Sequence, residues 1–247
     1  MRGVARFFVV ELKLYFREPQ ATFFTLAFPL MMLFIFGGVY GNESTPFFGG
    51  FGSVDMSVPA YTALVIATTG LMGLTVAMTS YRETGVLRRL QATPLAPAGI
   101  LAAEVFVYFV MTALGVIILV GAAQLIFGLR FSGRVLSMVG AFILCSLSFF
   151  SLGFVLAGLL PSVRSAHAVS MALFFPMIFL SGATIPREIL PEAVQRYSQI
   201  LPLTHVVNLL RALWIGTPWR NCLKETIVLA GMLAVGVAVS SRTFRWR

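Results

Sequence analysis

Long apolar runs separated by short polar segments dominate the pattern of hydrophobic and polar positions along the chain. Most of these runs are close to 20 residues long, which is about the length that an α-helix needs to cross a hydrocarbon layer of roughly 30 Å. We therefore predict an all-α, polytopic membrane protein, with residues 1–247 forming a single transmembrane domain. The six predicted spans are about 21–40, 59–80, 100–127, 136–160, 168–184 and 222–240.

Composition and charge support this class. Hydrophobic residues make up 58% of the chain and charged residues 11%, and the mean hydropathy is +0.91, whereas about a quarter of a soluble domain is charged. The net charge of +9 does not indicate nucleic-acid binding, because the basic residues stand at the ends of the apolar runs. That placement is typical of orientation by the positive-inside rule and of contact with anionic lipid headgroups.

The distribution of charge also predicts the orientation. Residues 41–58 are rich in glycine, contain Glu43 and Asp55, and lack lysine and arginine, whereas the N-terminal segment before them is basic. This asymmetry places the N-terminus in the cytoplasm and residues 41–58 outside, and six spans then return the C-terminus to the cytoplasm. No cleavable signal peptide is predicted, because the first 19 residues are charged throughout and have no small-residue cleavage site.

Three polar segments have amphipathic patterns. Residues 4–18 match a helix lying in the membrane interface, although a simple flank of the first span explains them equally well. Residues 81–97 match a short surface helix that binds a soluble partner, with Leu87 and Leu90 opposite the charged side chains. Residues 185–221 are divided by prolines into short helices, which we place on the outer side as interfacial or partly re-entrant pieces packed against protein.

The candidate chemistry is sparse. Glu104 is one of the few acids near membrane depth and so a functional candidate, but we favour a structural role in which interfacial water or Arg88 and Arg89 satisfy it. His167 is interpreted as a solvated loop residue, because nothing nearby completes a metal site. Cys145 and Cys222 give no disulfide or metal pattern. Walker A, HExxH and GxSxG motifs are missing from the sequence, so we predict no catalytic residue, metal or cofactor in this chain.

Three stretches together resemble one family. RETGVLRRLQATPLAPAGILAAE (82–104) is similar to the cytoplasmic signature of type-2 ATP-binding-cassette (ABC) transporter permeases, with Val86 where the family often has threonine. ELKLYFREP (11–19) resembles the interfacial helix of that family. The stretch 174–214 resembles its Phe-Leu-Ser-Gly block, which is followed by two prolines, a Pro-Leu-Thr element and a helix that ends in arginine. The three stretches occur in the family's order.

The resemblance implies partners. It implies a dimer of like or unlike permease subunits, with two cytoplasmic ABC ATPase subunits that carry the ATP and magnesium, in the cytoplasmic (inner) membrane of a bacterium or archaeon. Residues 81–95 would be the coupling helix, and 188–214 would form an outer gate. The implied ATPase-binding residues are Arg82, Glu83, Leu87, Arg88, Arg89 and Leu90. The implied gate residues are Pro186, Glu188, Pro191, Pro202 and Arg211.

The function implied by the resemblance is transport powered by a separate ATPase. We expect export of a hydrophobic drug, natural product or lipid-like molecule, along a route between two permeases near the first, second and fifth spans. The 23 phenylalanines suit an apolar cargo, although phenylalanine in a span mostly provides packing. An ion-coupled secondary transporter and a membrane-embedded enzyme are the alternatives. The enzyme requires clustered ionisable residues at membrane depth, and the secondary transporter would show buried acidic residues, internal repeats or broken helices in matching positions of two halves. Cargo, direction and dimer type stay open.

Overall fold

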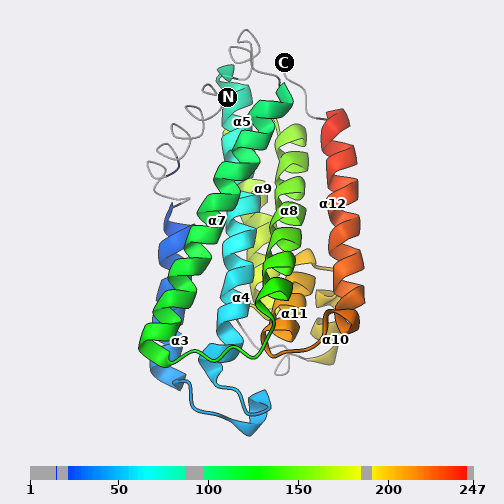
Figure 1. Ribbon diagram of the computed structural model, residues 1–247. Coiled ribbons are helices and arrows are strands. Elements are labelled where there is room, and N and C mark those ends of the chain that lie inside the picture. The colour runs from blue at the N-terminus through cyan, green and yellow to red at the C-terminus, as the bar shows by residue number, and fades with distance from the viewer. Residues whose placement is uncertain (1–14, 16–21, 87–96, 185–190, 244–247) are drawn as a thin grey trace.

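The computed structural model describes residues 15, 22–86, 97–184 and 191–243, which form a bundle of long helices without strands in those ranges (Figure 1). Within these ranges, six helical segments are long and apolar enough to cross a membrane, so the predicted all-α, six-span class is confirmed. The segments are Phe23–Tyr40, Ser53–Glu83, Gly99–Phe127, Val135–Leu159, Val163–Leu180 and Trp219–Thr243. The predicted interfacial helix at 4–18 lies outside the described residues except for Tyr15.

The described elements alternate between two ends of the bundle. In Figure 1, α5 and α12 end at the top, which we call the Arg82 end, and α4 and α8 begin at the bottom, the Asp55 end. The spanning elements are η1 (Phe23–Ala27), α3 (Phe28–Tyr40), α4 (Ser53–Ala67), η3 (Thr68–Leu74), α5 (Thr75–Glu83), α7 (Pro97–Phe127), α8 (Val135–Leu159), α9 (Val163–Leu180) and α12 (Leu223–Thr243). The shorter elements are η2 (Pro46–Phe48), α10 (Glu192–Ser198), α11 (Pro202–Trp214) and η5 (Trp219–Cys222).

The second span, α4–η3–α5, is the core of the bundle, and almost all of its apolar residues are buried inside the subunit. Elements η1, α3, α7, α8, α9 and α11 all pack against it. Its π-helical middle, η3, crosses α8 closely, since a Cβ atom on Gly153 would lie 2.4 Å from the carbonyl oxygen of Gly70. The Thr75 hydroxyl joins the two helices by donating to the carbonyls of Gly70 (3.2 Å) and Gly153 (3.3 Å). Small residues at a crossing allow this approach in a membrane, where packing rather than water drives association.

Helix α8 also packs along α12. The Ser148 hydroxyl donates to the Leu229 carbonyl at 2.9 Å, and a Cβ atom on Gly236 would lie 2.4 Å from the Ser151 hydroxyl oxygen. On the side that faces away from α8, α12 is exposed: Ile227 is 67% exposed and Val235 is 63% exposed. An apolar helix that is exposed on most of its surface suits contact with lipid.

The second and fifth spans begin five or six residues earlier than predicted. The second span begins at Ser53, so Asp55 lies in a helix and not in an outer loop. The fifth begins at Val163, so His167 is a half-buried helical residue of α9 and not a solvated loop residue. In both places side-chain caps satisfy the helix start: the Gly52 N–H donates to Asp55, and the Ser165 N–H donates to the hydroxyl of Ser162. Polar residues near a span therefore signalled a capped helix end and not a loop.

Candidate functional site

Arg82 and Glu83, at the end of α5, bind the turn between α8 and α9. The Arg82 guanidinium donates to the carbonyl of Gly158 at 3.1 Å and to the carbonyl of Leu160. The Glu83 carboxylate accepts from the N–H of Val163 at 2.7 Å, at the first residue of α9. A carboxylate at a helix N-terminus satisfies a free N–H and interacts favourably with the helix dipole. We call these two residues and residues 158–163 the Arg82–Glu83 clamp.

The clamp includes the first charged residues of the predicted ATPase-binding segment, 81–95. Of the six residues predicted to bind the partner, Arg82 and Glu83 are described, and Leu87, Arg88, Arg89 and Leu90 lie outside the described residues. Their binding role therefore stays a prediction. Through the clamp, the start of this segment is bound to the α8–α9 turn at the same end of the bundle. Nothing local in the sequence signals this contact, because it joins positions nearly 80 residues apart.

Replacing Arg82 by glutamine is expected to lower the free energy of unfolding by about 1–2 kcal/mol, because the change removes two charge-assisted donations at a half-exposed site. The measurement is thermal unfolding in detergent. Arg164→Gln is the matched control, since Arg164 is an exposed arginine in the first turn of α9. Equal stability of the Arg82→Gln and Arg164→Gln proteins would contradict a structural role for the clamp.

At the opposite end, Asp55 is fully buried and forms an ion pair with Arg130 (2.8 Å). One carboxylate oxygen accepts from the Asn42 amide at 2.9 Å and from the Arg130 backbone N–H at 2.8 Å. The other accepts from the Gly52 N–H at 2.9 Å and from the Arg130 Nε at 2.8 Å. Arg130 also donates to the Ser44 hydroxyl at 2.6 Å. We call Asn42, Ser44, Gly52, Asp55 and Arg130 the Asp55 cluster.

The Asp55 cluster joins two of the connections at its end of the bundle, the one between α3 and α4 and the one between α7 and α8. A buried charge is tolerated only when it is paired and its lone pairs are satisfied, and both conditions hold for Asp55. The indole N–H of Trp214 donates to the Arg130 carbonyl at 3.0 Å, which attaches the end of α11 to the same cluster. Asp55 and Arg130 fall in two predicted outer connections, 41–58 and 128–135, and no local pattern in the sequence pairs them.

Arg211, a predicted gate residue, holds three elements together. Its Nε donates to the Met56 carbonyl of α4 at 3.1 Å, and its Nη2 donates to the Gly182 carbonyl after α9 at 2.8 Å. Pro191 caps α10 and Pro202 is the first residue of α11, whereas Pro186 and Glu188 lie outside the described residues. Helix α11 packs against α4, α8, α9 and α12, and the gating role of these residues stays a prediction.

Glu104 is fully buried on α7. The sequence placed it near interfacial water, and this complete burial leaves it no exposure to water in the subunit. Arg88 and Arg89, the other predicted partners, lie outside the described residues, so that pairing stays a prediction. Within residues 22–86, 97–184 and 191–243, no three His, Cys, Asp or Glu residues are grouped so as to hold a metal ion.

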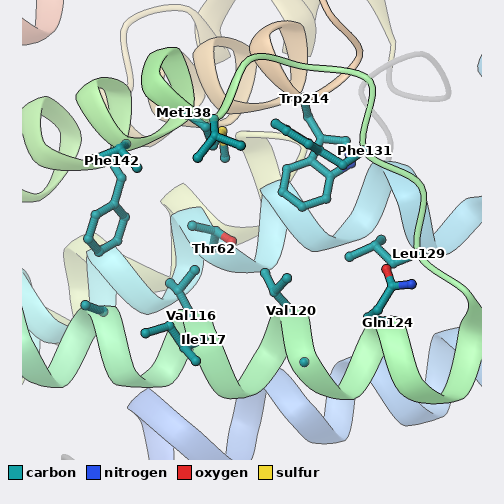
Figure 2. Close-up of a pocket in the computed structure, with 14 residues that line it drawn as sticks. Thr62, Val116, Ile117, Val120, Gln124, Leu129, Phe131, Met138, Phe142 and Trp214 are labelled. Atoms are coloured by element: carbon teal, nitrogen blue, oxygen red, sulfur yellow. The ribbon is translucent and has the colours of Figure 1, made fainter.

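A cavity of about 650 Å³ lies between α7 and α8 at the Asp55 end. Figure 2 shows Val116, Ile117 and Val120 on α7, with Met138 and Phe142 on α8, around Thr62 of α4. Phe131 and Trp214 lie together in the wall of the cavity, with their rings in an edge-to-face contact. We call it the apolar chamber, because Thr62 and Gln124 are the polar residues among its lining. The Thr62 hydroxyl is already used, since it donates to the Val58 carbonyl at 2.9 Å.

Comparison with known proteins gives a consistent result. The family model described as ABC-2 type transporter matches residues 6–214. The daunorubicin resistance ABC transporter permease protein DrrB1 of Streptomyces coeruleorubidus is 27% identical over 229 residues, covering 89% of this chain and 76% of that protein. Nodulation protein J of Rhizobium leguminosarum bv. viciae is 37% identical over 101 residues, 41% of this chain and 39% of the relative.

A further match is the inner membrane transport permease YhhJ of Escherichia coli (strain K12), which is 28% identical over 171 residues, 66% of this chain and 42% of that protein. The matched segments thus span about two fifths of the length of nodulation protein J and of YhhJ.

Proposed function

This chain belongs to the ABC-2 type transporter family, and on that premise we propose that it is the permease subunit of an ATP-driven exporter of hydrophobic molecules. The observation that carries the proposal is the family match over residues 6–214, which includes the segment 81–97 and the helices α10 and α11. The chain contains no nucleotide-binding motif, so ATP hydrolysis is assigned to a separate cytoplasmic ATPase. The Arg82 end is then cytoplasmic, and the Asp55 end is outside.

We infer that the ATPase binds the segment 81–95. Leu87 and Leu90 would form the apolar contact, and Arg88 and Arg89 would form charged contacts at its rim. The clamp supports this arrangement, because Arg82 and Glu83 connect the start of the segment to the α8–α9 turn. A displacement of the segment would therefore move α5, α8 and α9 together and not bend a free loop.

A second permease subunit would complete the transport route. The second span contributes little surface to it, since α4, η3 and α5 are buried inside the subunit. Helices α3 and α9 flank this core and expose large apolar side chains, Ile35 at 52% and Phe179 at 52%. We therefore place the route along α3 and α9, with α10 and α11 covering its outer end. Arg211 would hold that cover to α4 and to the end of α9.

The proposed cargo is a hydrophobic drug or natural product. DrrB1, which matches 89% of this chain, is named for daunorubicin resistance, so daunorubicin is a suitable first probe. In inverted vesicles that contain this chain and its ATPase, we expect ATP-dependent accumulation of daunorubicin that vanadate abolishes. The measurement is quenching of the drug's fluorescence during uptake. The matched control is the same complex with the ATPase's Walker A lysine replaced.

Two results would contradict this proposal in different ways. Uptake that follows a proton gradient and persists with the inactive ATPase would assign the chain to secondary transport. The complex could instead hydrolyse ATP in a vanadate-sensitive way and accumulate no hydrophobic probe. That result would support an ATP-driven transporter and reject the proposed cargo.

A further inference from the structure

Two hollows lie on either side of the segment 131–139, which leads from the Asp55 cluster into α8. The first is the apolar chamber. The second, of about 500 Å³, lies toward the turn between α11 and α12, and we call it the basic hollow after Arg134 and Arg220 in its lining. Residues of the segment divide between the hollows. Phe131, Val135 and Met138 line the chamber, and Ser132, Arg134 and Ser137 line the basic hollow.

The basic hollow carries positive charge without compensation. Its lining includes Arg134 and Arg220 and no aspartate or glutamate. Within the described part of the chain, neither of these exposed guanidinium groups has a hydrogen-bond or ion-pair partner, whereas the neighbouring Arg130 is bound to Asp55. Guanidinium groups bind phosphate oxygens well, because their planar N–H donors match the geometry of the anion.

The apolar chamber opens sideways between α7 and α8. Side chains at its rim are exposed on the outer surface of the bundle, with Ile117 at 67% and Val135 at 68%. In a membrane protein this surface faces hydrocarbon, so an acyl chain can enter the chamber directly from the bilayer. The volume of about 650 Å³ lies within the roughly 300–1,000 Å³ that is usual for sites that hold a small ligand.

We propose that the two hollows together bind one anionic phospholipid, with its phosphate at Arg134 and Arg220 and one acyl chain in the apolar chamber. The first turn of α8 separates the hollows, and a helix with its side chains is about 10 Å wide. The glycerol and the first carbons of an acyl chain can bridge this turn, whose Leu136 is 85% exposed. The lipid would fill the gap between α7 and α8, which pack against each other far less than α8 packs against α12.

A second copy of this chain is the competing occupant of the chamber. Charge argues against it, because a subunit with a net charge of +9 brings no surplus of negative charge to Arg134 and Arg220. An anionic headgroup supplies that charge, and a basic residue at a membrane surface favours anionic over zwitterionic lipid by about fivefold. The site is distinct from the transport route proposed along α3 and α9, so it does not depend on the cargo.

Tryptophan fluorescence can test this site, because Trp214 lines the chamber and Trp219 lines the basic hollow. The protein would carry Trp246→Phe, so that these two residues provide the signal. The protein would be placed in phosphatidylcholine vesicles of two kinds. One kind contains phosphatidylglycerol with brominated acyl chains, and the other contains phosphatidylcholine with brominated acyl chains. We expect brominated phosphatidylglycerol to quench the tryptophan fluorescence at a mole fraction on the order of tenfold lower than brominated phosphatidylcholine requires. Arg134→Gln/Arg220→Gln is expected to abolish that difference.

Gly121→Phe tests the chamber independently of charge. Gly121 lines the chamber, and a Cβ atom there meets no heavy atom within 4 Å, so phenylalanine can fill the space without disturbing the helices. Quenching by both brominated lipids is expected to fall. Gly231→Phe is the matched control, because that position on α12 is exposed and equally open, and quenching should not change.

Three results would overturn the proposal. Equal quenching by the two lipids in the parent protein would reject an anionic site. A preference for phosphatidylglycerol that survives loss of both arginines would place the lipid elsewhere. Weak quenching by both lipids, together with disulfide cross-linking between two copies through Ile117→Cys, would assign the chamber to a second subunit.

Discussion

Asp55→Asn is expected to lower the free energy of unfolding by about 2–4 kcal/mol, because it removes the charge on which a buried network depends. Asp55 accepts four hydrogen bonds, from Asn42, Gly52 and two groups of Arg130. The side-chain NH₂ of an asparagine at this position would face N–H groups that donate to the Asp55 carboxylate, so donors would be placed against donors. For a chain of this size the loss corresponds to a fall in Tm of about 5–10 °C, measurable by thermal unfolding in detergent.

Glu43→Gln is the matched control, because Glu43 is an exposed acid in the same connection between α3 and α4. Its effect should stay within about 0.5 kcal/mol. Arg130→Gln should cost at least as much as Asp55→Asn, since it leaves a fully buried carboxylate without its cation. The double variant should cost less than the sum of the single changes. Strict additivity would show that the ion pair does not couple the two residues.

The second large effect is expected at the predicted ATPase-binding segment. Arg88→Glu/Leu90→Asp puts acids in place of a cation that we propose for the rim of the contact and of a leucine that we propose as its apolar anchor. If the two residues have these roles, the double change should weaken binding of the ATPase by about a hundredfold or more. Both positions follow the clamp in the chain, so insertion and folding of the spans should be unaffected.

The six spans were predictable because the length of an apolar run is a local property of the chain. The predicted loops 41–58 and 161–168 are wrong in their last residues, which belong to α4 and α9. Asp55 and His167 both lie inside helices, since capping and ion pairing satisfy polar groups at the start of α4 and α9. A polar residue beside a span therefore requires a search for its partner before it is assigned to solvent.

The contacts that organise the two ends of the bundle could not be predicted in the same way. Asp55 and Arg130 are 75 residues apart, and Glu83 and Val163 are 80 apart. No local pattern links such positions, although the sequence did place each residue near a span end. The close crossing at Gly153 has the same cause, because glycines in apolar runs are too common to indicate which pair meets.

The basic hollow and the apolar chamber also depend on the arrangement of the chain. Arg134 and Arg220 come from connections that are widely separated in sequence. In the sequence each resembles an ordinary basic residue at the end of a span. Phe131 and Met138 likewise read as parts of an apolar run. Their common location becomes visible only once α8 is packed beside α7 and the end of α11.

The most direct test of the account is co-purification of this chain with its candidate ATPase, combined with vanadate-sensitive ATP hydrolysis in reconstituted membranes. The parent protein would be compared with Arg88→Glu/Leu90→Asp, and with Arg164→Glu as a charge-reversal control at the same end of the bundle. We expect the double variant to insert normally and to lose both association and hydrolysis, while the control keeps both. Unchanged association of the double variant would contradict docking through residues 81–95.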